Sequence, residues 1–149
     1  MEALQTAHLQ VVSELDELAP VLTWFDQFYH CSISQTAWFQ CQLALAEGFT
    51  NAVRHAHKLL PPSTPIEIEV LRFAEQINIC IWDSGGGFDL NGALAQLPPA
   101  IPPSAEGGRG LKLMQRLVDD ISYCRQDNRN CLYLFKRLTA DHALSSEPL

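Results

Sequence analysis

Two runs of alternating apolar and polar residues in the middle of the chain constrain its fold most strongly. They span 66–70 and 77–82, and isoleucine or valine occupies every second position in each. Because successive side chains of a strand point to opposite faces, this period predicts two strands that each bury one face. Ala74 and Glu75 lie near a tight turn between the runs, so the sequence predicts an antiparallel hairpin.

Helical patterns flank this hairpin. A first helix is expected to open at residues 16–17, with Pro20 in its first turn, where a missing N–H costs little. Ser34 is the expected N-cap of a long second helix that runs to about Lys58. Its apolar side is predicted to comprise Trp38, Leu45, Phe49 and Val53. A short helix is expected to start near Gly110, with an apolar face formed by Leu111, Met114, Leu117 and Ile121.

Together the elements indicate the fold class. Further strands are expected at 9–13, 121–125 and 131–138, the last two around a turn at 127–130. Strands joined by hairpins predict an α+β two-layer sandwich, with helices packed on one face of a mixed, mostly antiparallel sheet. We expect a single domain over 1–139 and a flexible polar tail over 140–149.

Size, charge and cysteine usage limit the classes of function. The 149 residues fit one domain, and 47% apolar residues suffice for a packed core. A formal net charge of −7 disfavours nucleic acids and anionic membranes as partners, because their phosphates repel an acidic chain. Five scattered cysteines without a C-x-x-C pair indicate reduced thiols. With no signal peptide and no stretch of ~20 apolar residues visible, a cytoplasmic protein is expected.

The second strand of the hairpin ends in Asp83 and a glycine loop. Asp83 is in phase with the isoleucines before it, so its carboxylate is expected on the buried face, where it needs a donor. That donor is either the following turn, as in an Asx-turn, or the exocyclic amine of a ligand such as adenine. Gly85, Gly86 and Gly87 permit a flexible turn or the close approach of a flat ring or phosphate.

A second glycine cluster, Gly107 to Gly110, directly precedes a predicted helix. It is either an ordinary entry into the helix or an anion site at a helix N-terminus, where Arg109 adds a positive charge suited to phosphate. The segment 90–107 between the clusters contains four prolines, and its length is typical of a lid.

The long helix carries Glu47 and Asn51 four residues apart, hence on one face. An isolated Glu and Asn on one helix face favour the interpretation that this face is polar and exposed to solvent. The alternative makes Asn51 a neutral oxygen ligand for Mg²⁺ and Glu47 a general base beside a γ-phosphate. His55 and His57 are two apart and lie on different helix faces, which favours solvated or locally paired histidines over a metal site.

Three motifs occur in a fixed order, whereas the P-loop and the H-R-D and D-F-G elements of ordinary protein kinases are absent. The motifs are Glu47-x-x-x-Asn51-Ala52, Asp83-x-Gly85-x-Gly87-Phe88 and Gly108-x-Gly110-Leu111-x-Leu113. Jointly they resemble the ATP-binding fold shared by gyrase, the Hsp90 chaperone, sensor histidine kinases and the MutL repair protein. Within that group the chain most resembles the anti-sigma-factor serine/threonine protein kinases, because the domain is short and Phe88-Asp89 follows the glycines.

The resemblance implies a role for each matching residue, with ATP and Mg²⁺ as ligands. Asp83 would accept the adenine amine, Asn51 would bind Mg²⁺ and Glu47 would be the catalytic base. The residues implied to shape the nucleotide cleft and its phosphate side are Gly85, Gly87, Gly108, Arg109, Gly110 and Leu111.

The resemblance also implies partners. Such proteins bind a sigma factor, hold it from RNA polymerase, and phosphorylate a Ser or Thr of a small antagonist protein, usually as homodimers. Two other functions stay open: a non-catalytic ATP-dependent binding module, and a detached histidine-kinase catalytic domain. The second lacks support, since no phospho-acceptor helix pair is visible.

Overall fold

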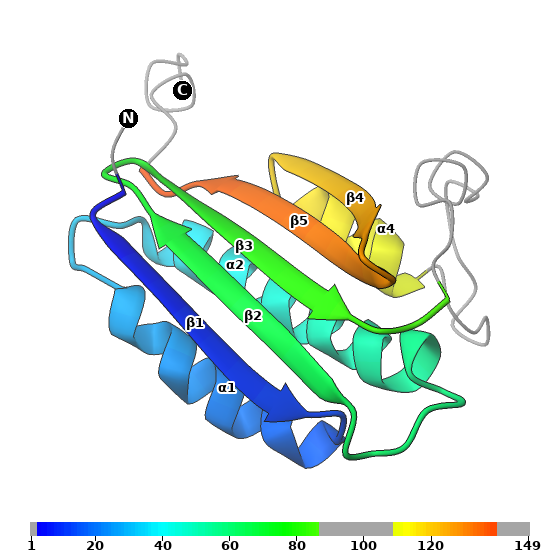
Figure 1. The fold of residues 1–149 in the computed structure, drawn as a ribbon. Helices are drawn as coiled ribbons and strands as arrows, with labels where there is room; N and C mark the ends of the chain where they lie inside the picture. The colour runs from blue at the N-terminus through cyan, green and yellow to red at the C-terminus, as the bar shows by residue number, and fades with distance from the viewer. Residues whose placement is uncertain (1–2, 87–108, 140–149) are drawn as a thin grey trace.

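One antiparallel sheet covered by helices on a single face forms the fold (Figure 1). The computed structural model describes residues 3–86 and 109–139. The strands are β1 (Gln5–Val12), β2 (Pro65–Arg72), β3 (Gln76–Asp83), β4 (Asp120–Gln126) and β5 (Arg129–Arg137). The helices are α1 (Leu18–Phe25), α2 (Gln35–Asn51) and α4 (Arg109–Leu117), with 3-10 turns at Leu15–Glu17 and Asp26–Phe28. A π turn, Ala52–Ala56, continues α2.

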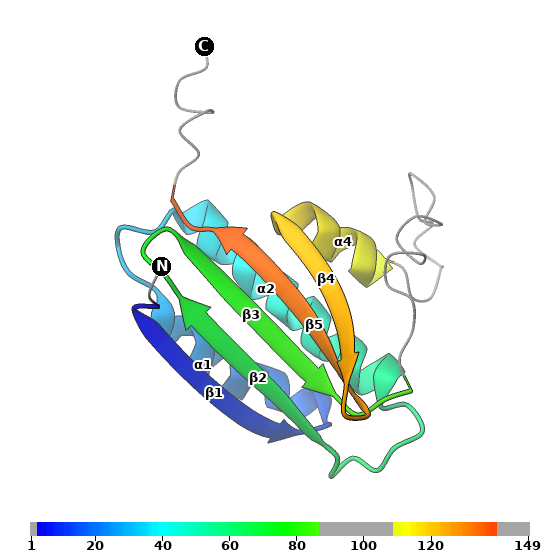
Figure 2. The ribbon, with the colours of Figure 1, turned by 45° about the horizontal axis from the view of Figure 1, so that its top comes forward.

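The strands lie in the order β1-β2-β3-β5-β4, and every neighbouring pair in the described sheet is antiparallel. Helices α1, α2 and α4 lie behind this sheet in Figure 1, and Figure 2 shows the same two layers from another angle. The predicted α+β two-layer sandwich is confirmed. The predicted tail at 140–149 lies outside the described residues.

The hairpin predicted from the alternating runs is formed by β2 and β3. Its register places Ile68 opposite Ile81 and Val70 opposite Ile79, so the apolar residues of both strands share one face. All of them are at most 1% exposed: Ile66, Ile68, Val70, Ile77, Ile79 and Ile81. Burying this face removes a continuous apolar surface from water and fixes the register, because a slip of one residue would expose it.

Helix α2 packs directly on this apolar face. The residues predicted for its apolar side are buried or half-buried: Trp38, Leu45, Phe49 and Val53. Gly48 permits the close approach, because a Cβ there would lie 2.5 Å from Ile81 Cδ1 and 3.2 Å from Leu132 Cδ2. The distance between helix and sheet therefore depends on the absence of a side chain at Gly48.

Several observed boundaries differ from the predicted ones. The long helix predicted to run to about Lys58 ends as α2 at Asn51 and continues as the π turn to Ala56. β1 begins at Gln5 rather than at residue 9, and Ile121 lies in β4 rather than on the apolar face of α4. The helix ends at Leu117 because Asp119 joins the sheet edge. The Asp119 N–H donates to the Phe135 carbonyl at 2.9 Å, and Asp119 Oδ2 accepts from the Arg137 N–H at 2.7 Å.

The turn between β4 and β5 falls within the predicted 127–130 region. Asp127 and Asn128 have φ angles of 53° and 62°, as required at both central residues of a two-residue type I′ hairpin turn. None of the helices in the described part of the chain is long and apolar enough to cross a membrane.

The N-cap of α2 gives a first test of the fold. Ser34 Oγ accepts a hydrogen bond from the Ala37 N–H at 3.2 Å, which confirms the predicted cap. Ser34→Ala should lower the free energy of unfolding by about 1 kcal/mol, because an N–H of the first turn loses its acceptor. Ser34→Asp keeps an acceptor and should retain most of that stability. Urea unfolding followed by circular dichroism measures both variants, and equal losses would contradict the capping role.

Candidate active site

The C-terminal half of α2 faces the start of α4. Glu47 and Asn51 are both half-buried there rather than on a freely solvated face. A Cβ on Gly110 would lie 2.8 Å from Glu47 Oε2 and 3.2 Å from Asn51 Oδ1. Any larger residue at 110 would displace these side chains, so the first and third motifs of the sequence meet at this point.

Asp83 ends β3 and points into the protein, as its phase predicted. Asp83 is only 7% exposed. Its Oδ1 accepts a hydrogen bond from the Gly85 N–H at 2.8 Å, which forms the Asx-turn. Oδ1 also accepts from Asn130 Nδ2 at 2.8 Å. Both hydrogen bonds that described residues make to this carboxylate end on Oδ1. The Asx-turn therefore leaves Oδ2 for a donor from elsewhere, and the two alternatives for Asp83 are compatible.

Two residues that hold the glycine loop were missed in the sequence. Asn130 is fully buried, and its Nδ2 also donates to the Gly85 carbonyl at 3.0 Å. Arg125 Nη1 donates to the same carbonyl at 2.9 Å and to Asn130 Oδ1 at 2.7 Å. In the sequence Asn130 lay in a polar turn region, with no signal that separated it from its polar neighbours. Its role follows from the register of β3 and β5, which places Asn130 opposite Asp83.

The other side of the loop rests on the end of the α2 segment. His57 Nε2 accepts the Ser84 N–H at 2.8 Å, so His57 is locally paired, as predicted, while His55 is exposed. Burial lowers the pKa of His57, and the nearby Asp83 carboxylate opposes this effect. The described residues contain no group of three or more His, Cys, Asp and Glu side chains that could hold a metal ion.

Gly85 packs against the same helix end. A Cβ at this position would lie 2.6 Å from the Ala56 carbonyl oxygen, a backbone atom that cannot rotate away. The segment from Glu47 to His57 thus contacts both glycine regions. Figures 1 and 2 show the ends of α2 and β3 and the start of β5 at the same end of the molecule.

Several predicted site residues fall outside this description. Gly87, Gly108 and the proposed lid at 90–107 lie outside the described residues, as does the side chain of Arg109. The backbone of Arg109 begins α4, and Leu111 in the first turn is half-buried against the core.

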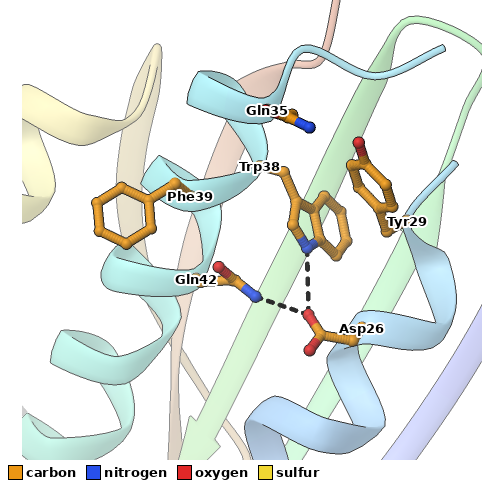
Figure 3. A pocket seen from close by; sticks show the side chains of 6 residues that line it. All are labelled: Asp26, Tyr29, Gln35, Trp38, Phe39 and Gln42. Carbon is orange, nitrogen blue, oxygen red and sulfur yellow. Dashed lines mark hydrogen bonds between the residues drawn. The ribbon is translucent and has the colours of Figure 1, made fainter. Parts of the chain in front are cut away.

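A groove lies away from the three motifs, between the end of α1 and the first half of α2 (Figure 3). It is an open groove of about 420 Å³ lined by Asp26, Tyr29, Gln35, Trp38, Phe39 and Gln42. Asp26 Oδ1 accepts from Trp38 Nε1 at 3.2 Å and from Gln42 Nε2 at 2.7 Å. None of its lining residues belongs to the three motifs, so this groove is separate from the candidate site.

Two adjacent glycines provide a matched test of the loop geometry. Gly85→Ala should lower the free energy of unfolding by about 1–3 kcal/mol, because its Cβ collides with the Ala56 backbone. Gly86→Ala should be nearly neutral, since a Cβ there meets nothing within 4 Å. Urea denaturation of both variants measures the difference. Equal effects would mean that the packing of Gly85 on α2 does not fix the loop.

Comparison with known proteins agrees with the fold and the motifs. Residues 11–136 match the family described as the histidine kinase-like ATPase domain. Serine-protein kinase RsbW from Bacillus licheniformis is 32% identical over 85 residues, 54% of this chain and 53% of the relative. RsbW from Bacillus pumilus is 34% identical over 86 residues, with the same coverage. The chain thus spans about half the length of the curated relatives it matches.

A solved structure shows the same fold. The RsbU and RsbW domains of Rv1364c from Mycobacterium tuberculosis superpose with a TM-score of 0.61 at 14% identity, over 90% of this chain and 32% of that one. The resemblance drawn from the motifs is thereby confirmed at the level of the family. Because the matched region includes the Glu47–Asn51 helix and the Asp83 loop, the chain belongs to the histidine kinase-like ATPase domain family.

Proposed function

We propose that the chain binds ATP with Mg²⁺ and acts as a serine/threonine protein kinase of the anti-sigma type. The observation that carries the proposal is the contact of Gly110 with Glu47 and Asn51, on the helix whose end holds the Asp83–Gly85 loop. A carboxylate base, a carboxamide oxygen and an acceptor for a purine amine are thus carried by packed elements. The similarity to serine-protein kinases named RsbW supports the same class of activity.

The adenine end of the site is assigned to Asp83. Its Oδ1 is occupied by Gly85 and Asn130, so Oδ2 is the atom we assign to the exocyclic amine. A carboxylate fixed by two donors is preorganised, and its other oxygen would accept the ligand amine. Gly85 and Gly87 would let the ring approach the backbone closely.

The phosphate end is assigned to the start of α4 and the facing side of α2. Asn51 fits Mg²⁺, because its Oδ1 is a hard, neutral oxygen on the side of α2 that faces Gly110, where a Cβ would lie 3.2 Å from it. Mg²⁺ bound there would neutralise charge on the phosphates. Gly108, Arg109, Gly110 and Leu111 would present backbone N–H groups and one guanidinium to phosphate oxygens.

Glu47 is assigned as the general base of phosphoryl transfer. Its carboxylate would accept the proton of a Ser or Thr hydroxyl while that oxygen bonds to the γ-phosphorus and the bond to the ADP oxygen breaks. The hydroxyl must come within hydrogen-bond reach of Glu47, roughly 3 Å. This chemistry relies on positioning and charge, so the rigid contact between α2 and α4 is its main structural requirement.

The partners are assigned by family resemblance. They are a sigma factor that is sequestered and a small antagonist protein that supplies the hydroxyl, with the kinase acting as a cytoplasmic homodimer. Phe25 in α1 and Phe28 in the 3-10 turn after it are at most 2% exposed and belong to the core, so they do not form a partner surface. The net charge of −7 disfavours direct contact with nucleic acid.

Nucleotide binding is the first test of the function. Mg-ADP should bind and should raise the melting temperature, because a ligand of the folded state stabilises it by mass action. Asp83→Asn keeps an acceptor oxygen for Gly85 and Asn130 but puts an N–H donor in place of Oδ2. It should weaken Mg-ADP about 10- to 100-fold, as expected for losing a hydrogen bond to a charged group.

Asp120→Asn is the matched control, since Asp120 is exposed at the sheet edge and lies outside the three motifs. Titration calorimetry measures all three proteins. Absence of binding to the wild-type protein at millimolar nucleotide would refute the proposed function.

A second pair of variants separates metal binding from chemistry. Asn51→Ala should lose the Mg²⁺-dependent part of the affinity. Glu47→Gln should bind nucleotide normally but transfer phosphate about 10²- to 10⁴-fold more slowly, as expected for removal of a general base. The assay incubates the protein with its co-purified small partners and labelled Mg-ATP, followed by mass spectrometry of those partners.

The product of that assay identifies the class of function. Phosphoserine or phosphothreonine on a partner supports the proposed kinase. Phosphohistidine would indicate a histidine-kinase catalytic domain, and nucleotide binding without any transfer would indicate a non-catalytic binding module. An equal loss of binding in both variants would make Glu47 a structural residue.

A further inference from the structure

His57 contacts the glycine loop but belongs to none of the three motifs. It follows the π turn at the end of α2, and it is only 3% exposed. Its Nε2 lies 2.8 Å from the Ser84 backbone nitrogen, and Ser84 lies between Asp83 and Gly85. An imidazole thus replaces a backbone carbonyl as the partner of a loop N–H, which fixes the side of the loop opposite Asn130.

The hydrogen bond determines the protonation state of the ring. A backbone N–H only donates, so Nε2 must carry a lone pair, and the proton of the neutral imidazole must be on Nδ1. His57 Nδ1 is buried and has no hydrogen-bond partner among the residues that the structure describes. A doubly protonated ring would place its Nε2–H against the Ser84 N–H, donor against donor, and would leave the amide without an acceptor.

The charged groups around His57 act in opposite directions. Asp83 faces it from β3 and favours the cation, whereas burial favours the neutral ring and has the larger effect. Arg125 reaches the loop from β4 and donates to the Gly85 carbonyl. On its own segment, His55 and Lys58 are exposed. Neutral His57 is therefore the form that this environment stabilises at neutral pH.

We propose that His57, as the neutral Nδ1–H tautomer, is a positioning residue that holds the Asp83–Gly85 loop in its nucleotide-binding geometry. This inference rests on the proposed function, because it assigns the purpose of that loop to nucleotide binding. His57 touches no reacting atom. It acts through Ser84, whose amide it fixes, and thereby through the orientation of Asp83 and the close contact of Gly85 with Ala56.

The proposal has a defined pH dependence. Because the pKa of His57 is lower in the folded protein than the ordinary 6.5, the unfolded chain binds its proton first as the pH falls. The stabilisation by neutral His57 is therefore complete above pH 6.5, and it is lost as the pH falls from there through the lower folded-state pKa. Loop geometry and nucleotide affinity should decline together over this range.

Three variants test the role of His57. His57→Gln places a non-titrating amide oxygen near the Nε2 position and should keep the wild-type affinity for Mg-ADP at pH 7.5. His57→Leu removes the acceptor and should weaken Mg-ADP about five- to tenfold, the effect of one lost hydrogen bond. His55→Gln is the matched control, because it makes the same change at an exposed histidine two residues away.

Calorimetry at pH 7.5, 6.5 and 5.5 gives the dissociation constants. Phosphate groups of the nucleotide titrate near pH ~6 and change the affinity of every variant. The informative quantity is therefore the dissociation constant of the wild type divided by that of His57→Gln at each pH. That ratio should rise as the pH falls below 6.5, by at most the roughly five- to tenfold effect of one lost hydrogen bond, and His55→Gln should behave like wild type. A constant ratio, or normal binding by His57→Leu, would overturn the proposal.

Two measurements on the free protein keep this test separate from that of the proposed function. Nitrogen-15 NMR of the His57 ring should show the Nδ1–H tautomer, and the Ser84 amide should exchange with solvent more slowly than in His57→Leu. An Nε2–H tautomer, or equal exchange, would overturn the assignment even if nucleotide binds. If the wild-type protein bound no Mg-ADP, the proposed function would fail, and with it the link to nucleotide. The tautomer and the exchange rate would then still decide whether His57 holds the loop.

Discussion

The packing of α2 on the buried face of the sheet is the constraint on which the rest of the structure depends. Alternating isoleucines on β2 and β3 create an apolar surface that must be covered, and Gly48 allows the helix to lie close to Ile81 and Leu132. That contact fixes the depth and rotation of α2. The depth and rotation then decide that Glu47 and Asn51 face Gly110, and that the helix end reaches the loop after β3.

The buried Asp83 carboxylate is tolerated because a polar network surrounds it. Gly85 and Asn130 donate to one of its oxygens, Arg125 binds both Asn130 and the Gly85 carbonyl, and His57 accepts the Ser84 amide. Within the described residues His57 Nδ1 has no hydrogen-bond partner, but the bonds to Asp83 Oδ1, the Gly85 carbonyl and the Ser84 amide hold the loop in one geometry. The loop is thus held from the β4–β5 hairpin on one side and from α2 on the other.

The fold alone does not select an activity, because one architecture can carry several chemistries. What narrows the choice is the distribution of polar groups over the layers. Glu47 and Asn51 lie on one helix, and the Asp83 carboxylate lies at the end of a central strand. The groove lined by Asp26, Tyr29, Gln35, Trp38, Phe39 and Gln42 lies apart from all of them. Phosphoryl transfer from a nucleotide to a partner hydroxyl, as proposed above, would use Glu47, Asn51 and Asp83 together.

By itself the sequence determined the elements and the direction of their side chains. The period of two placed Asp83 inward with the isoleucines, the helical period put Glu47 and Asn51 on one face, and Ser34 marked the start of α2. Only the tertiary structure decided which residues meet. The sequence placed Asn130 in a turn and Arg125 at the end of a strand, and it predicted His57 to be solvated or locally paired. It named no partner for any of them, because periodicity reports the face of a residue's own element and not its neighbours on another. Their partners follow from strand register and from the depth of α2, which exist only once the layers have packed.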